Sequence, residues 1–472
     1  MTTRPATVGA LRASGYPDRT VKQEIAANAA ARLRVGAPVV DGLVGFDQTV
    51  LPALETALLA GHDLILLGER GQAKSRILRA LVGLLDEEIP VVAGSETNDH
   101  PYHPFSPYAQ ALVDEHGDDT PITWLGRQER FAEKLATPDI AVADLVGDVD
   151  PIKVAEGRYL SDELTVHYGL VPRHNRGIVA INELPDLAER IQVALLNVME
   201  ERDVQVRGYS LRLPLDLLVV ATANPEDYTN RGRIITPLKD RFGAEVRTHY
   251  PRRLADEVAV MRQEARLIGR DADVSLPPAI VPGFMREVLA AFTRALRRAP
   301  EVNQRSGVSV RFSTGNYETI AGSAVRRALR TGEERAVARP ADLAQVLSAG
   351  IGKVEFETFE EGRESEVLER LLRRALLEVF RRRTAGVDLS GLVERFDGGL
   401  AIETGDLVSA EELLGQLDSV PGMAKLLAAL DVEEESPALA AAALEFALEG
   451  LHLSRKIDRT DVGPAAYRYE GA

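Results

Sequence analysis

Eight residues, GERGQAKS (68–75), constrain the fold of this chain more than any other stretch. They follow the apolar run Leu64–Leu67 and precede a helix-forming run, Arg76–Leu85, so the sequence predicts a buried strand, a tight turn and a helix. The stretch matches the phosphate-binding pattern G-x-x-x-x-G-K-[ST] except at its sixth position, where Ala73 replaces glycine. The residues alone leave two interpretations open, a nucleotide site and a plain strand–turn–helix.

A phosphate-binding loop needs backbone N–H groups that face inward, an adjacent helix N-terminus and a lysine that reaches the phosphates. Lys74 fits the role of this lysine, and the hydroxyl of Ser75 is placed to bind Mg²⁺. Since glycine is needed where φ is positive, we expect positive φ at Gly68 and Gly71. Ala73 is expected to lie at the helix start, where a Cβ atom is tolerated.

A second polar pair follows the apolar run at 177–181, which ends in Asn182 and Glu183. In a Walker B strand an aspartate holds Mg²⁺ and the next glutamate activates the attacking water. Glu183 fits the second role, whereas Asn182 keeps an acceptor oxygen but lacks the charge. We therefore predict slow turnover, which an Asn182→Asp substitution would speed. A helix N-cap pair is the alternative interpretation of these two residues.

Two further polar residues come next in the chain. The apolar run Leu217–Thr222 leads to Asn224, whose side chain could bond the γ-phosphate or the attacking water. Arg241 precedes the weak apolar run at 244–248, and its permanent charge suits transition-state stabilisation across a subunit interface. Taken alone, an arginine of this kind is more often solvated or in a structural ion pair, and the four signals in this order favour the functional interpretation.

The pattern of apolar runs predicts the fold class. Short continuous runs that alternate with amphipathic stretches are typical of buried parallel strands in an α/β protein. After Pro251 the chain becomes rich in helix formers, and an acidic linker at 431–437 leads into an Ala- and Leu-rich helix at 437–453, which we expect to pack in a lid or in an oligomer contact. The runs expected as strands are Leu64–Leu67, Pro90–Ala93, Gly177–Ile181, Leu217–Thr222 and Ala244–Thr248.

Composition excludes several classes of site. The chain has no cysteine, so disulfides and thiolate metal sites are ruled out, and its net charge of −16 opposes broad binding to nucleic acid. No apolar span of about 18 residues is present, so we expect a cytoplasmic protein without a membrane segment. His100, His103 and His116 are too few for a tetrahedral zinc site and are expected in a polar surface loop. The leucines within 370–383 predict a packed helix whose arginines face solvent.

Together these motifs resemble the AAA+ ATPases, and among them the magnesium-chelatase I-subunit and MoxR-like families, over residues 40–330. MoxR-like proteins commonly have alanine at the sixth loop position, so the resemblance favours a nucleotide site. Residues 144–160 resemble the helix-2 insert, 191–228 the pre-sensor hairpin that leads into sensor 1, and GVSVRF (307–312) the sensor 2 region.

The resemblance implies a P-loop NTPase fold of the α/β class, with a five-stranded parallel sheet, an α-helical lid and a helical C-terminal extension. The corresponding division is an N-terminal lead-in at 1–40, a nucleotide-binding domain at 41–250, a lid at 251–384 and the extension at 385–472. It also implies a ring, expected to be a homo-hexamer, that binds ATP between neighbours.

Site residues follow from the resemblance by position. Val44 and Gly45 would lie near the adenine, and residues 68–76 would hold the phosphates. Mg²⁺ would be held by Ser75, Asn182 and Glu183. The remaining roles are a catalytic glutamate at Glu183, a phosphate-binding lysine at Lys74, sensor 1 at Asn224, a finger in trans at Arg241 and sensor 2 at Arg311; the loop itself comprises Gly68, Glu69, Arg70, Gly71, Gln72, Ala73, Lys74, Ser75 and Arg76.

Three functions are compatible with these features. The first is a chaperone-like motor that hydrolyses ATP with Mg²⁺ and remodels a partner, which in related families often has a von Willebrand factor A domain or serves metal insertion. The second is an ATP-binding switch or scaffold with little hydrolysis, which Asn182 keeps open. The third is a nucleic-acid-acting AAA+ protein, which the negative net charge and the lack of the GAFTGA motif of sigma-factor activators disfavour.

Overall fold

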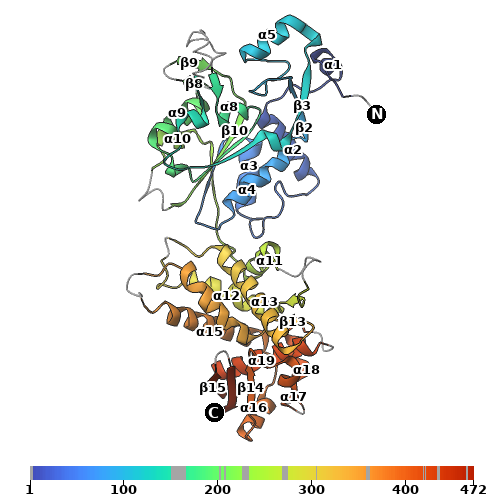
Figure 1. The fold of residues 1–472 in the computed structure, drawn as a ribbon, viewed down its shortest axis with the longest axis vertical. Helices are drawn as coiled ribbons and strands as arrows, with labels where there is room; N and C mark the ends of the chain where they lie inside the picture. Colours follow the sequence, from blue (N-terminus) through green and yellow to red (C-terminus); the bar gives the residue numbers. More distant parts are fainter. Residues whose placement is uncertain are drawn as a thin grey trace. The chain divides into compact units, whose positions relative to one another are not determined.

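The computed structural model forms two compact units, Met1–His249 and Tyr250–Ala472 (Figure 1). Each unit has its own hydrophobic core, so each is described by itself. The residues that the structure describes are 4–149, 166–200, 203–206, 209–225, 233–267, 275–303, 306–357, 362–417, 419, 421–432, 436–463 and 466–472.

The first unit is built on a parallel sheet. The described strands pair in the order β11-β1-β10-β7-β4, and each neighbouring pair is parallel. This confirms the predicted five-stranded parallel sheet. The strands are β11 (Ala244–Arg247), β1 (Leu64–Leu67), β10 (Leu217–Ala223), β7 (Gly177–Asn182) and β4 (Phe131–Leu135).

Helices cover both faces of this sheet, which is why its inner strands are continuously apolar. Leu64 and Leu66 face the core that contains α2 (Val21–Arg34) and α3 (Val50–Leu59), whereas Ile65 and Leu67 face the core on the opposite side. Helix α4 (Lys74–Ala80) joins the first side, and α9 (Glu189–Glu200) and α10 (Thr236–Arg241) join the second (Figure 1).

One predicted strand lies elsewhere. The run at 90–93 was expected in the parallel sheet, but β2 (Glu88–Val92) pairs antiparallel with β3 (Ile122–Gly126) in a separate ribbon. The outer strand is β4, whose sequence FAEKL contains two charged residues. An edge strand meets only one neighbour and stays partly solvated, so it lacks the continuous apolar signal on which the sequence prediction rests.

Residues 1–40 differ from the expected polar lead-in. Helix α1 (Val8–Ala13) and helix α2 both bury apolar side chains, and α2 contributes Val21, Ile25 and Ala29 to the sheet core. Helix α2 alone spans 14 residues of this segment.

A buried ion pair fastens α2 to the sheet. The guanidinium of Arg130, directly before β4, donates to both carboxylate oxygens of Glu24 at 2.8 and 2.6 Å. Its Nε donates to the carbonyl oxygen of Arg176 at 2.9 Å, directly before β7. The Arg130 side chain is fully buried, so α2, β4 and β7 meet at one charged group.

The histidine-containing segment is exposed at His103 and His116 but not at His100. His100 is largely buried, and burial lowers its pKa to about 3. His103 and Asp18 form an ion pair at 2.7 Å when the imidazole is protonated. His116 ends helix α5 (Pro107–His116). Within the described ranges no group of three or more His, Cys, Asp or Glu residues is arranged to hold a metal ion.

Two segments expected to surround the site are described in part. Residues 150–160 of the expected insert lie outside the described residues, and β5 (Gly147–Val149) and β6 (Val166–Tyr168) pair antiparallel on either side of them. In the expected pre-sensor segment, α9 is followed by an antiparallel pair, β8 (Asp203–Val206) and β9 (Tyr209–Arg212). Residues 207–208 and 226–228 lie outside the described residues.

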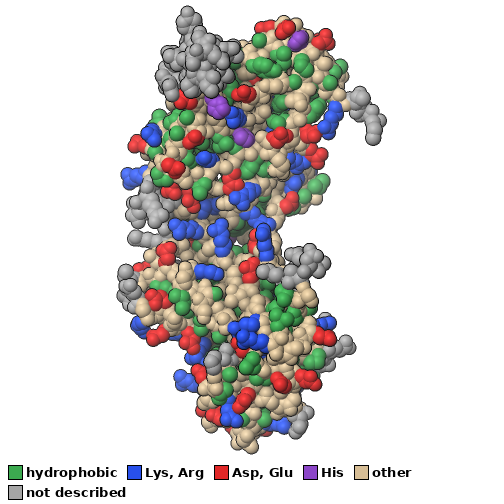
Figure 2. All heavy atoms as spheres, viewed as in Figure 1, with side chains coloured by type: hydrophobic (Ala, Val, Ile, Leu, Met, Phe, Trp, Pro, Cys, Tyr) green, Lys and Arg blue, Asp and Glu red, His purple; other side chains and the backbone are tan. Residues whose placement is uncertain are grey.

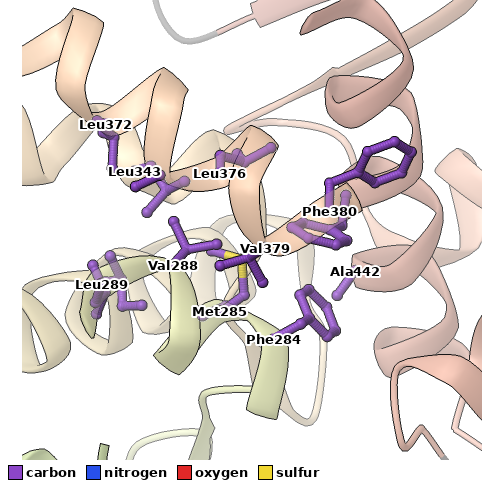
Figure 3. Packing of buried hydrophobic residues seen from close by; sticks show 14 of the residues in the cluster. Phe284, Met285, Val288, Leu289, Leu343, Leu372, Leu376, Val379, Phe380 and Ala442 are labelled. Carbon is purple, nitrogen blue, oxygen red and sulfur yellow. The ribbon is translucent and has the colours of Figure 1, made fainter. Parts of the chain in front are cut away.

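The second unit is mainly helical and has one continuous core. In Figure 3, Phe284, Met285 and Val288 of one helix face Leu376 and Val379 of another. Phe446 joins them, with its ring 4.7 Å from that of Phe284 and 5.9 Å from that of Phe380. The main helices are α11 (Leu254–Glu264), α12 (Gly283–Leu296), α13 (Val310–Thr331), α14 (Ala344–Gly350), α15 (Glu364–Arg383) and α19 (Pro437–Leu453).

The prediction of a packed helix at 370–383 is confirmed by α15. Leu371, Leu372 and Leu376 are buried, while the arginines lie at the surface. Several of these arginines are paired rather than only solvated, since Arg382 and Arg383 both donate to the carboxylate of Glu287. Such pairs account for the arginine content of the helix without a nucleic-acid partner.

The section after 385 is not purely helical. Strands β14 (Ile402–Gly405), β16 (Ala466–Gly471) and β15 (Ile457–Gly463) form an antiparallel sheet that the sequence did not predict. Strand β15 reads IDRTDVG and exposes most of its residues, so it has no apolar run to detect. Helix α19 is buried on nearly all sides and shares the core of α12 and α15. The expected lid and extension are therefore one unit.

Within the described residues no helix has the length and apolar character needed to cross a membrane.

The buried ion pair generates a prediction about stability. We expect Arg130→Ala to lower the free energy of unfolding of the first unit by about 3–5 kcal/mol, because the substitution leaves the Glu24 carboxylate buried without a partner. Urea unfolding followed by circular dichroism measures the change. Arg12→Ala is the matched control, since the pair of Arg12 with Asp118 is exposed and is worth about 1 kcal/mol or less. Equal effects of the two substitutions would contradict the prediction.

Candidate functional site

The candidate site lies at the carboxyl edge of the sheet. The register of β1, β10 and β7 sets Leu67 beside Ala223 and Ala221 beside Ile181, so the three strands end together. The loop after β1, the pair Asn182–Glu183 after β7 and Asn224 after β10 therefore come to one edge. Ligands of open parallel sheets bind outside this edge.

Lys74 connects the loop to the neighbouring strand. Its Nζ donates to the carbonyl oxygen of Glu69 at 2.9 Å and to Oδ1 of Asn224 at 2.8 Å, and it also donates to the carbonyl oxygen of Gly68. The lysine side chain is buried among these oxygen acceptors. The structure thus brings together two residues that are 150 positions apart and that the sequence had placed in one site.

The loop conformation corrects two expectations about glycine. Gly71 has φ of +77°, as expected, but φ of Gly68 is not positive, whereas Ala73 has φ of +61°. Ala73 lies at the helix start as expected, as the N-cap of α4, but its left-handed conformation costs a non-glycine residue about 1–2 kcal/mol. Gly68 is required for a different reason: a Cβ atom there would overlap Oγ1 of Thr248 and Oε1 of Gln72.

Gln72 and Thr248 hold the loop in this conformation. Oε1 of Gln72 accepts a hydrogen bond from the Glu69 backbone N–H at 3.0 Å and another from Thr248 Oγ1 at 3.1 Å. The backbone N–H of Thr248 donates to the carbonyl oxygen of Leu67 at 2.8 Å. Sequence reasoning missed Thr248; its place just after the last strand of the sheet was the available signal.

Glu183 is placed to act on a bound molecule. Its backbone has φ of +58°, and its N–H donates to Thr222 Oγ1 at 2.9 Å. Within the described residues the Glu183 carboxylate makes no hydrogen bond or ion pair, and the residue is half-buried. A carboxylate in this position can accept a proton from water.

Asn182 lies in a polar chain that runs across three strands. Thr222 Oγ1 donates to Asn182 Oδ1 at 3.2 Å, and Asn182 Nδ2 donates to Oε1 of Glu133 on β4 at 2.5 Å. Arg79 of α4 donates to both oxygens of Glu133, at 2.7 and 3.0 Å. Sequence reasoning missed Glu133 because β4 itself was missed.

The segment expected near the adenine lies against the end of the sheet. Val44 and Gly45 are half-buried, and Gly45 has φ of +76°. Next to them, the ring of Phe46 packs edge-on against His249 with centroids 5.1 Å apart. Nε2 of His249 lies 2.7 Å from Thr49 Oγ1.

The two arginines predicted to act on the nucleotide, Arg241 and Arg311, lie far from the phosphate-binding loop in the sequence. Arg241, at the end of α10, is exposed and pairs with Glu200 of α9. Arg311 lies in the second unit, in the first turn of α13, and is exposed. In the loop itself Arg70 is exposed and Arg76 is half-buried.

The donors at the edge fit a hard divalent cation. The Ser75 hydroxyl, Oδ1 of Asn182 and the Glu183 carboxylate are oxygen donors, which Mg²⁺ prefers. Mg²⁺ is commonly bound through few protein ligands together with substrate phosphates and water, so the lack of a dense acidic cluster in the described part of the chain is compatible with this cation.

The close packing at Gly68 generates a prediction. Gly68→Ala is expected to weaken binding of a fluorescent ATP analogue about tenfold or more, because the added Cβ displaces Thr248 and Gln72 and with them the loop. Equilibrium fluorescence titration measures the affinity. Gly83→Ala is the control, since a Cβ atom there meets only the Arg32 side chain at 3.7 Å. Unchanged affinity in the first variant would show that the loop does not contact the nucleotide.

Comparisons with known proteins agree with this arrangement. Residues 128–243 match the model of the ATPase family associated with various cellular activities (AAA). The 38 kDa magnesium-chelatase subunit of Rhodobacter capsulatus is 30% identical over 234 residues, which is 47% of this chain and 59% of that protein. The magnesium-chelatase subunit ChlI of Anabaena variabilis is 29% identical over 211 residues, 43% of this chain and 56% of that protein. The chain thus spans somewhat over half the length of these curated relatives.

Solved structures give weaker similarities. NtrX from Brucella abortus has a TM-score of 0.45 at 16% identity and covers 82% of this chain and 73% of its own. Because this score is below 0.5, the assignment rests on the sequence matches and the sheet. The parallel sheet, with a lysine-bearing loop after β1, and the matches to the AAA family and to magnesium-chelatase subunits lead to one conclusion. Residues 128–243 match the AAA ATPase family, and the α/β unit that contains them is similar in sequence to magnesium-chelatase I subunits.

Proposed function

We propose that the protein is a Mg²⁺-dependent ATPase that works as a ring and remodels or activates a partner protein. The observation that carries the proposal is the contact of Lys74 Nζ with Asn224 Oδ1 at 2.8 Å, beside a Glu183 carboxylate that has no partner in the described residues. A lysine, a polar strand tip and a water-activating carboxylate at one sheet edge are what hydrolysis of a nucleoside triphosphate requires.

Each residue at the edge has a role in this proposal. Backbone N–H groups of residues 68–75 and the Lys74 ammonium group bind the phosphates, which replace the carbonyl and amide oxygens that Lys74 now contacts. Ser75 and Asn182 would hold Mg²⁺, which supplies charge stabilisation at the phosphates when bound. Glu183 accepts the proton of the attacking water, and Asn224 orients that water or the γ-phosphate.

Arg241 and Arg311 complete the site in the proposed ring. Arg241 is exposed, and its surface pair with Glu200 is weak, so the guanidinium is available to a nucleotide on a neighbouring copy. Arg311, in the helical unit, would contact the phosphates as sensor 2. We propose a homo-hexamer because the resemblance to magnesium-chelatase I subunits and MoxR-like proteins implies one.

The partner is proposed from the same resemblance. The curated relatives are named as subunits of magnesium chelatase, which supports work with a further protein. We propose a chaperone-like action in the cytoplasm on a partner with a von Willebrand factor A domain, with metal insertion as one such setting.

A second candidate is an ATP-binding switch with little hydrolysis. Asn182 favours it, because an amide holds Mg²⁺ less strongly than a carboxylate does. A nucleic-acid-acting machine has less support: acidic and basic side chains are intermixed on the face that Figure 2 shows, and the net charge is −16.

The first experiment measures Mg²⁺-dependent phosphate release from ATP over a range of protein concentrations. Specific activity is expected to rise with concentration as rings assemble, and Lys74→Ala, Glu183→Gln and Arg241→Ala are each expected to reduce it about a hundredfold or more. Arg247→Ala is the control, since Arg247 pairs only with surface Glu245 among the described residues.

Activity that is independent of concentration, with Arg241→Ala unaffected, would contradict the trans-acting arginine. ATP binding without phosphate release at any concentration would favour the switch. Light scattering with ATP measures the mass of the assembly, and a mass that stays at that of one chain would refute the ring.

A further inference from the structure

The contact between Asn182 and Glu133 bears on which residue supplies the negative charge of the proposed Mg²⁺ site. Asn182 occupies the position where a carboxylate would hold Mg²⁺, yet its side chain donates a hydrogen bond to a carboxylate on the neighbouring strand. Glu133 on β4 pairs in register with Ala180, two residues before Asn182, so the two side chains emerge on the same face of the sheet. An amide and an acid therefore lie in direct contact at this edge.

The orientation of the Asn182 amide follows from its neighbours. Because an ionised carboxylate only accepts hydrogen bonds, the NH₂ group of Asn182 must face Glu133. Oδ1 then faces Thr222, whose hydroxyl accepts from the Glu183 N–H and donates to Oδ1. The amide is fixed at both ends, and its oxygen faces β10 at the edge where the strands end.

Helix α4 places the same acid beside the expected cation ligand. Arg79 contacts both oxygens of Glu133, and Ser75 lies four residues before Arg79 and thus on the same face of the helix. Only 20% of the Glu133 side chain is exposed, whereas 66% of the Arg79 side chain is. The pair is bidentate, but its guanidinium is largely in water, so Arg79 can turn away from Glu133 at modest cost and release the carboxylate charge to a cation.

We propose that the negative charge of the Mg²⁺ site has moved from β7 to β4, so that Glu133 supplies the charge and Asn182 the oriented oxygen. Glu133 is a positioning residue, which acts on the cation through Asn182 or through water. This inference rests on the proposed Mg²⁺-dependent ATPase function. It reverses one expectation from the sequence: Asn182→Asp alone would set two carboxylates in contact and would weaken the site rather than speed turnover.

The test measures nucleotide binding in a Glu183→Gln background, in which hydrolysis is blocked. The dissociation constant of a fluorescent ATP analogue is determined with EDTA and with Mg²⁺, and the ratio of the two is the metal enhancement. Glu133→Gln keeps an acceptor for the Asn182 amide but removes the charge, so the enhancement is expected to fall about tenfold or more. The metal enhancement is expected to fall by a similar factor in Asn182→Asp.

The double substitution distinguishes a moved charge from simple damage. The double variant, with both Asn182→Asp and Glu133→Gln, exchanges the acid and the amide between the two positions. Its metal enhancement is expected to return to within about threefold of the parent value. Glu245→Gln is the matched control, because Glu245 is a paired acid on the opposite edge strand β11. Mn²⁺ binding followed by electron paramagnetic resonance, with ATP present, gives a second measure, and thermal unfolding verifies the fold.

The outcomes separate this inference from the proposed function. If Glu133→Gln leaves the metal enhancement unchanged, or if Asn182→Asp alone raises it, the inference is wrong. The ATPase proposal would remain intact in either case. A double variant no better than either single variant would also overturn it. A parent whose ATP affinity does not depend on Mg²⁺ would refute the proposed function itself.

Discussion

Parallel pairing of β1 with β10 and β11 is the constraint on which the first unit depends. Both faces of β1 and β10 are covered by helices, so their interior positions are almost all apolar. Polar groups can appear only where the strands end, and parallel strands end at a common edge. The same rule that makes the core apolar therefore gathers Lys74, Asn182, Glu183 and Asn224 into one place.

Backbone strain and close packing shape that edge. Ala73 and Glu183 both adopt the left-handed conformation, one in the loop after β1 and the other after β7. Such strain persists where the surroundings over-determine the conformation, and here Lys74, Gln72 and Thr222 hold the two turns by hydrogen bonds. The loop is thus set in place by its own side chains.

The strands that could be predicted from the sequence are those that contain a continuous run of apolar residues. Runs such as LILL and GIVAIN are continuously apolar, so β1 and β7 and the residues that follow them were found. Strand β4, FAEKL, has two adjacent charged residues and lies at an edge, so it was missed together with Glu133. Left-handed φ at Ala73 occurs in a loop whose Gln72 side chain bonds Thr248, 176 residues later in the chain, and no local pattern encodes that contact. The C-terminal sheet was missed because β15 is largely polar and exposed, and β14 and β16 are short strands without a continuous apolar run.

The ion pair of Glu24 with Arg130 also defines where the nucleotide-binding unit can be cut. Arg130 lies three residues before Glu133 and contacts the backbone at the start of β7, while Glu24 lies in a helix that the sequence pattern had assigned to a lead-in. A fragment that begins at residue 41 would retain every motif of the site yet leave a guanidinium buried without its acid. The boundary of the folded unit is therefore set by charge burial, well upstream of the first recognisable motif.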